Sequence, residues 1–178
     1  MRETERLIKE FAHSGHPLGR GITPEEVPPL IEQLAERLGD SSRRLNLTPS
    51  SLKALSKLLV DLHSTFVKQN EAIGDVETIQ LVREVAAYIG QVFVVNTRGQ
   101  WRNSGDLWGT EIVLAGPVEG VKTGEVRQYR NSVASLGQIA ASTWDAVIAG
   151  TEPKLHRVYQ NVIATRAVEK PPKRQANV

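Results

Sequence analysis

Residues 76–95 have the sequence VETIQLVREVAAYIGQVFVV, and this stretch decides the fold because its hydrophobic pattern changes at Gly90. Before Gly90 the apolar residues have the spacing of an inward-facing helix stripe, at Val76, Ile79, Val82, Val85, Ala86 and Ile89. After it, the run 92–95 is β-branched and aromatic, which is typical of a strand. We therefore predict a helix over 76–89, capped by Asp75 and ended by a Gly90 of positive φ, that leads directly into a strand over 92–95.

The residues before this stretch are predicted to be helical. Residues 2–12 form an amphipathic pattern, which a Gly- and Pro-containing segment then interrupts. Thr23 and Pro24 mark the start of a helix that runs to Gly39, and the prolines at 28 and 29 place its regular part from there on. A third helix over 48–69 carries an apolar seam at Leu52, Leu55, Leu59, Leu62 and Phe66. We interpret this seam as core, because two heptads are too few to indicate a coiled-coil dimer face.

The residues after Gly90 are predicted to form a small sheet and two closing helices. Further strands are expected over 110–114 and 124–129, followed by a helix over 133–149 capped by Ser132 and a last helix capped by Thr151. The fold class is therefore α+β: N-terminal helices, a short antiparallel β-meander of about three strands, and two C-terminal helices. We divide the chain into an N-terminal helical extension (1–47), a core domain (48–168) and a disordered basic tail (169–178).

Composition and charge indicate an ordinary globular protein whose basic character lies at its end. Hydrophobic residues make up 40% and charged residues 24% of 178 residues, and the absence of cysteine excludes disulfides and thiolate metal sites. From residue 166 onward four cations stand against one acid, so residues 1–165 carry a charge of −1 out of the total of +2. Nucleic acid would therefore be contacted through the tail, by Lys170, Lys173 and Arg174. The charged N-terminus and the short apolar runs predict a cytoplasmic protein with no membrane segment.

No catalytic constellation is recognisable in the sequence. The chain lacks cysteine, a G-x-S-x-G nucleophile turn and both Gly-rich phosphate-binding patterns, and its clustered serines stand at helix starts, where capping explains them. The four histidines are interpreted as loop or boundary residues, because metal sites need further ligands that the sequence does not offer nearby, at His13, His16, His63 and His156. We predict no catalytic residues, no metal and no cofactor.

Residues 98–109, RGQWRNSGDLWG, are the most informative stretch for function. Two of the three tryptophans fall here beside arginines, and these two residue types most often anchor protein interfaces. The partner-binding residues are therefore predicted to be Arg98, Trp101, Arg102 and Trp108. The alternative is that Trp101 and Trp108 cover the small sheet against a helix, in which case they belong to the core.

Part of the sequence resembles a group of uncharacterised bacterial proteins. In that group a Ser-Leu-x-x-Leu helix precedes a Tyr-hydrophobic-Gly turn, a strand and a Gly-x-Trp hairpin, matched here by Ser51, Leu52, Leu55, Tyr88, Ile89, Gly90, Gly99 and Trp101. Members commonly carry Glu after that glycine, whereas this chain has Gln91. The resemblance covers about half of the chain and implies a fold of helices with a small sheet, and no particular reaction.

Three hypotheses for function follow, each from a different class. The leading one is a non-enzymatic bacterial module that binds another protein, as an immunity or accessory subunit of a larger effector system. The second is an enzyme whose site is assembled from scattered polar residues. The third is a nucleic-acid-associated accessory factor that uses the basic tail.

Overall fold

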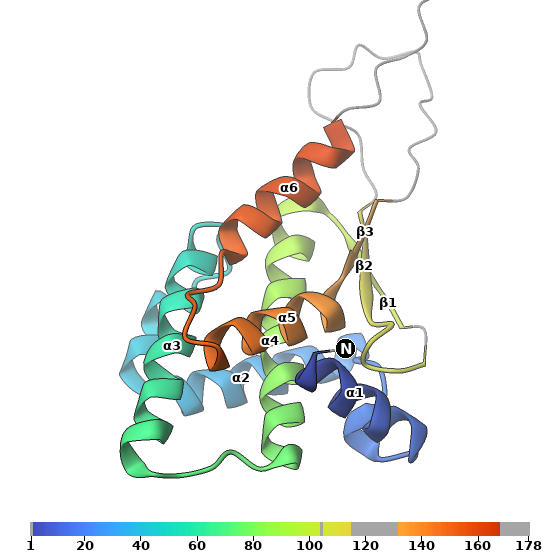
Figure 1. Ribbon diagram of the computed structural model, residues 1–178. Helices are drawn as coiled ribbons and strands as arrows, with labels where there is room; N and C mark the ends of the chain where they lie inside the picture. Colours follow the sequence, from blue (N-terminus) through green and yellow to red (C-terminus); the bar gives the residue numbers. More distant parts are fainter. Residues whose placement is uncertain (1, 104, 115–131, 168–178) are drawn as a thin grey trace, which may run out of the picture.

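The structure of the chain, a computed structural model, describes residues 2–103, 105–114 and 132–167 (Figure 1). Within these residues six α-helices accompany one three-stranded antiparallel sheet, which confirms the α+β class with a short β-meander. The helices α1 (Glu3–His13), α2 (Val27–Leu38) and α3 (Ser51–Gln69) precede the long α4 (Asp75–Thr97). The predicted tail residues Lys170, Lys173 and Arg174 lie outside the described residues.

The first 47 residues are part of the same hydrophobic core as the rest of the chain. One cluster of fully buried residues joins this part of the chain to α3. It contains Ile8 of α1, Ile22 from the segment before α2 and Leu34 of α2, together with the seam residues Leu52, Leu55 and Leu59. Helix α1 packs on α5 (Leu136–Ile148), and α2 packs along α4. No separate core corresponds to the predicted extension 1–47 in the described part of the chain.

Of the predicted helix starts, the one at Thr23 and Pro24 is confirmed in detail. Residues Pro24–Glu26 form one 3-10 turn (η2), and the regular helix α2 begins at Val27, so that both following prolines lie in its first turn. The Glu26 carboxylate accepts a hydrogen bond from the Thr23 N–H at 2.8 Å, which satisfies a donor at the start of the helix. Helix α3 begins just after Thr48 and Pro49 and fully buries Leu52, Leu55 and Leu59 of its seam, whereas Leu62 and Phe66 are half-buried. The predicted caps Asp75 and Thr151 are wrong, because Asp75 is already the first residue of α4 after its N-cap Gly74, and the last helix begins only at Leu155.

The predicted break at Gly90 is wrong, because α4 continues through it to Thr97. Gly90 does not have a positive φ. A Cβ at this position would lie 2.2 Å from Cη2 of Trp101 and 2.5 Å from Cδ1 of Leu136, so the glycine lets these side chains pack against the helix backbone. The run 92–95 is therefore helical, and its first two residues, Val92 and Phe93, are fully buried. At the other end Val76, predicted to face inward, is 56% exposed.

The helix ends eight residues later than predicted. Arg98 adopts the left-handed conformation with φ 56°, and its N–H donates to the Val94 carbonyl. At 23 residues α4 is long and apolar enough to span a membrane, which corrects the expectation that no stretch is long enough. However, 72% of its most apolar part is buried inside the protein, as expected for a central core helix.

The sheet contains one of the predicted strands and two that were not predicted. Strand β1 (Gln100–Arg102) pairs antiparallel with β2 (Glu111–Leu114), which pairs with β3 (Ser132–Ser135), in the order β1-β2-β3. The strand expected over 110–114 is confirmed, and the strand expected over 124–129 lies outside the described residues. Ser132 begins β3 instead of capping a helix, so α5 starts only at Leu136.

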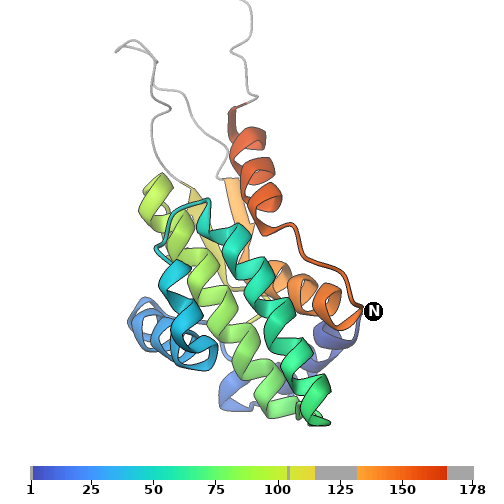
Figure 2. The same cartoon turned by 90° about the vertical axis from the view of Figure 1, so that its left-hand side faces the viewer.

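Helix α6 (Leu155–Ala167) closes the described chain and positions the surface discussed below. It packs against α3 and β3, and its Tyr159 ring lies 4.7 Å from the Phe93 ring of α4, centroid to centroid. Figures 1 and 2 show α6 beginning near α3 and then rising away from α5.

Candidate functional site

The two tryptophans of the predicted partner site are half-buried, and each has a contact within the chain. Trp101, on β1, packs over Gly90 of α4, as described above. The Trp108 ring lies under Lys9 of α1, whose Nζ is 5.0 Å from the ring centroid. Neither ring is among the exposed large hydrophobic residues, so the described contacts favour their role as a cover over the sheet and helices.

The two arginines of the predicted partner site differ from each other. Arg102 faces Glu111 on the neighbouring strand and forms an ion pair with it. Arg98 is exposed, at the left-handed residue that ends α4. The partner site at Arg98, Trp101, Arg102 and Trp108 stays a prediction, and three of these four side chains are already engaged within the chain.

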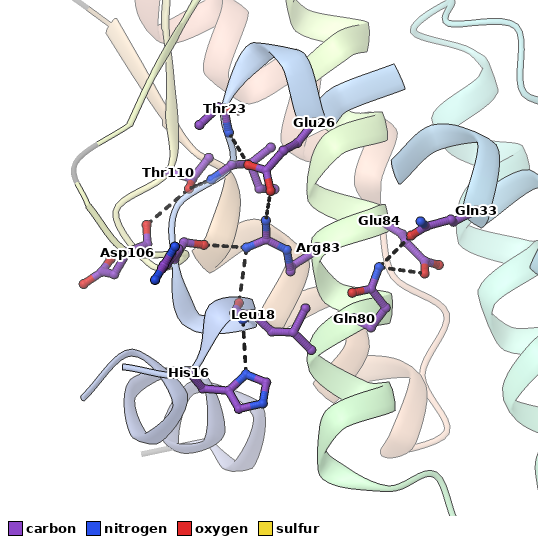
Figure 3. A network of polar contacts seen from close by, with 12 residues as sticks. His16, Leu18, Thr23, Glu26, Gln33, Gln80, Arg83, Glu84, Asp106 and Thr110 are labelled. Carbon is purple, nitrogen blue, oxygen red and sulfur yellow. Dashed lines mark hydrogen bonds and ion pairs between the residues drawn. The ribbon is translucent and has the colours of Figure 1, made fainter. Parts of the chain in front are cut away.

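The most buried cation of the described chain is Arg83, on α4 (Figure 3). Its Nη1 donates to the carbonyl oxygens of Leu18, at 3.2 Å, and of Arg20, while its Nη2 donates to Glu26 Oε1 at 3.0 Å. Burial lowers the pKa of Arg83 below its ordinary value, and the Glu26 carboxylate opposes that shift. Arg83 thus uses its donors to fix the segment that leads into α2.

Residues 105–110 also form hydrogen bonds with the segment 18–26 that leads into α2. Thr110 Oγ1 accepts from the Ile22 N–H at 3.0 Å and donates to the Asp106 carbonyl at 3.2 Å. The Leu107 N–H donates to the Gly19 carbonyl at 2.9 Å. The polar groups shown around Arg83 in Figure 3 therefore connect three parts of the chain and serve the fold.

A second buried network joins α4 to α2. Glu84, with 1% of its side chain exposed, accepts from Arg37 Nε at 2.9 Å and from Nη2 at 3.1 Å, a bidentate pair. Arg37 Nη1 also donates to Glu77, and Gln80 donates to Gln33 at 2.7 Å. A shallow depression exposes the edge of this network, where the buried Glu84 carboxylate is paired with Arg37 and the exposed Glu36 also lines the depression.

Tyr88 joins α4 to the start of α3. Its hydroxyl lies 2.6 Å from Ser51 Oγ and accepts from the Leu47 N–H at 3.2 Å. Burial raises the pKa of the Tyr88 hydroxyl above its ordinary value, and the two hydrogen bonds act in the opposite direction. Ser51 and Tyr88 are therefore in direct structural contact.

His16 and His63 each contact another described residue, and the interpretation of the four histidines as loop or boundary residues stays a prediction. His16 Nδ1 accepts from the Leu18 N–H, and the ring of His63 meets that of Trp144 edge-on at 5.9 Å. Residues 2–103, 105–114 and 132–167 contain no cluster of three side chains able to hold a metal. In the same residues the buried Trp144 Nε1 and Asp145 Oδ2 lack a hydrogen-bond partner, but neither residue lines the surfaces described next.

A group of exposed cations on and next to α3 and α6 forms the surface that the sequence reasoning missed. Two adjoining depressions share Lys53 and Lys57, and together they are lined by the cations Arg44, Lys53, Lys57, Lys154 and Arg157. We call these five residues the basic face. All five side chains are exposed, and none of these side chains forms a hydrogen bond or ion pair with any described residue. One carboxylate, Glu152, lines the same depressions.

The basic face corrects the interpretation that the folded part is electrostatically neutral. The sum of −1 over residues 1–165 is compatible with a local excess of cations, because many acids lie elsewhere, for example Glu32 and Glu36 on α2. A signal was present in the sequence: Lys53 and Lys57 stand four residues apart, on the face of the helix opposite to the leucine seam. Their proximity to Lys154 depends on packing between residues about 100 positions apart, which no local pattern reveals.

A groove between α5 and α6 borders the basic face. It has a volume of about 440 Å³ and is lined by half-buried aliphatic side chains together with exposed polar ones: Ile139, Ala146, Val158 and Val162, with Gln138 and Ser142. Pro153, Lys154 and Leu155 line both this groove and one basic depression. The groove and the basic face are therefore parts of one continuous surface.

Comparison with protein-family models, with curated proteins and with solved structures finds no match for this chain.

Proposed function

We propose that this protein is a non-enzymatic module that binds an acidic partner protein through the basic face. The observation that carries this proposal is the group of five exposed cations around two adjoining depressions, whose side chains have no partner among the described residues. A charge that is paired within the protein can contribute to the stability of the fold, whereas a cluster of unpaired like charges repels itself. Such a cluster becomes favourable when an oppositely charged surface covers it, and it also steers that surface into place.

The rest of the described chain supports binding over catalysis. Its buried ionisable residues Arg83 and Glu84 have their charges compensated within the protein. A catalytic acid or base has to reach a substrate, whereas Arg83 is bonded to backbone carbonyls and to Glu26, and Glu84 is paired with Arg37. An immunity or accessory subunit needs only a complementary surface on its effector, which is consistent with this arrangement.

A protein partner is favoured over nucleic acid by the residues that line the depressions. Modules that bind single-stranded nucleic acid combine cations with aromatic side chains on which bases stack. Neither basic depression is lined by a tryptophan, tyrosine or phenylalanine. Lys154 instead also lines an aliphatic groove, and such a groove can accommodate apolar side chains of a partner protein.

The test is a titration of the full chain with a labelled acidic peptide of about 20 residues and, separately, with a single-stranded oligonucleotide of similar charge. The peptide should bind, and the double variant Lys53→Glu/Lys57→Glu should weaken its binding about tenfold or more. The control is Arg2→Glu/Lys68→Glu, which reverses two exposed cations outside the basic face. Equal weakening by both variants would overturn the proposal, and so would tighter binding of the oligonucleotide than of the peptide.

A further inference from the structure

We propose that the α5–α6 groove and the basic face together bind an acidic amphipathic helix of the partner. This inference rests on the proposed function and specifies the part of the partner that is recognised. Its apolar stripe would lie on Ile139, Val158 and Val162, while carboxylates on its flank would face Lys154, Lys57 and Arg157.

The continuity of the two surfaces is the first argument. The residues Pro153–Leu155 line both the groove and the basic depression, so a ligand that fills the groove contacts residues that also line the basic depression. The apolar side chains that line the groove recur along α6 at Leu155, Val158 and Val162, with spacings of three and four residues. This is the spacing of a helix surface, and a second helix packs its own stripe between two such ridges.

The charge pattern is the second argument. Five cations stand against Glu152 around the depressions, and all of them lie on the α3 side of α6, whereas Gln138 and Ser142 on the α5 side are uncharged. A helix in the groove would therefore meet positive charge along one flank alone. That asymmetry fixes its orientation about its own axis and requires acids on the corresponding flank.

The experiment compares two acidic peptides of identical composition with the full chain. One peptide carries leucines at the positions i, i+3, i+4 and i+7, with glutamates on one flank, and in the other the same residues are scrambled. The amphipathic peptide should bind about tenfold more tightly, because only it can bury its apolar side chains while its acids reach the basic face.

The variant Ser142→Arg separates groove binding from electrostatic attraction. It places a long side chain in the groove at an exposed helix position, and it adds a positive charge. An attraction of charges alone predicts equal or tighter binding of both peptides. Groove binding predicts that the amphipathic peptide loses its advantage of about tenfold, while the scrambled peptide binds as before or more tightly. The matched control is Gln160→Arg, an exposed residue of α6 that does not line the groove.

The outcomes distinguish this inference from the proposed function. Equal binding of both peptides to the unaltered chain would overturn the groove inference, and so would an unchanged advantage in Ser142→Arg. In either case a loss of binding in Lys53→Glu/Lys57→Glu alone would still support the basic face. The circular dichroism spectrum of each variant shows whether it is folded, and Gln138→Arg provides a second groove variant at another exposed position.

Discussion

The buried charges of α4 and the exposed charges of the basic face are arranged in opposite ways. Arg83 and Glu84 are adjacent in the sequence, point to different neighbours and are compensated by groups of the same chain. Lys53 and Lys57 lie on one exposed face of α3 and have no described partner. The first arrangement contributes to folding, because removing one member leaves the other buried and uncompensated. The second contributes nothing comparable to folding, which leaves its charges available for another molecule.

The largest effect is expected at the buried pair on α2 and α4. Arg37→Ala would leave the Glu84 carboxylate buried without its bidentate partner, and the loss should be about 3–5 kcal/mol in the free energy of unfolding. Urea denaturation followed by circular dichroism measures it. The double variant Arg37→Met/Glu84→Leu replaces both charges by apolar groups and should recover most of the loss. A cost below about 1 kcal/mol for Arg37→Ala would show that the network is not part of the fold's stability.

The next effect concerns the glycine that the sequence reasoning misread. Gly90→Ala should cost about 1–3 kcal/mol, because the new methyl group would overlap the Trp101 ring and a methyl of Leu136. In an unhindered helix the same change would raise the free energy of unfolding by about 1 kcal/mol. The sign of the measured change therefore shows whether the space beside Gly90 is occupied. Urea denaturation of Gly90→Ala in a Trp101→Ala background provides the control, where the penalty should be clearly smaller. Equal penalties in both backgrounds would refute the packing explanation.

Gly90 shows where local sequence patterns lose their meaning. The helices over 2–12 and 48–69 and the strand over 110–114 were predictable, because the periodicity that defines them is local and their start signals agree with it. At Gly90 a glycine followed by β-branched residues resembles a helix end, yet burial of Val92 and Phe93 overrides the local preference. The reason for the glycine is a ring 11 residues further on and a leucine from α5, and neither contact has a local signature.

The candidate binding residues were likewise predictable from the sequence only in part. The like-charged pair Lys53 and Lys57 could be read from the outer face of a predicted helix, whereas the hairpin arginines and tryptophans received more weight because of their residue types. Residue type does not reveal that Arg102 pairs with Glu111 or that Lys9 covers Trp108. Those partners come from a neighbouring strand and from the first helix, and only the folded chain brings them together.

A smaller effect is expected at Tyr88, where a buried polar group is uncharged. Tyr88→Phe should cost about 0.5–1.5 kcal/mol at neutral pH, because the Leu47 N–H loses its acceptor and Ser51 loses one of its contacts. Urea denaturation at neutral pH measures this cost. An increase in the free energy of unfolding would instead show that burying the Tyr88 hydroxyl costs more than its two hydrogen bonds contribute.

The ionisation of Tyr88 adds a pH dependence with a definite sign. Burial raises the pKa of the folded-state hydroxyl above the unfolded value of about 10, so the unfolded chain loses its proton first as the pH rises. The stability present below about pH 10 should therefore decline as the pH passes through 10 and up to the folded-state pKa. Tyr159, whose pKa burial also raises, contributes in the same direction. Unfolding free energies at about pH 8 and pH 11 should show a smaller decline in Tyr88→Phe than in the unaltered chain.

The smallest effect is expected on the basic face, and its sign is the opposite of all the others. Lys53 and Lys57 stand four residues apart on α3, where like charges repel by about 0.2–0.5 kcal/mol. Lys57→Gln keeps the helix propensity and the length of the side chain, so it should leave the free energy of unfolding unchanged or raise it by about that amount, most clearly at low salt. The comparison is Lys68→Gln in the last turn of the same helix, where the lysine complements the helix dipole and its removal should be neutral or slightly destabilising. A loss of more than about 1 kcal/mol in Lys57→Gln would mean that this lysine is part of the fold. A gain would mean that the basic face is maintained against a small cost in stability, as expected of cations that await an acidic partner.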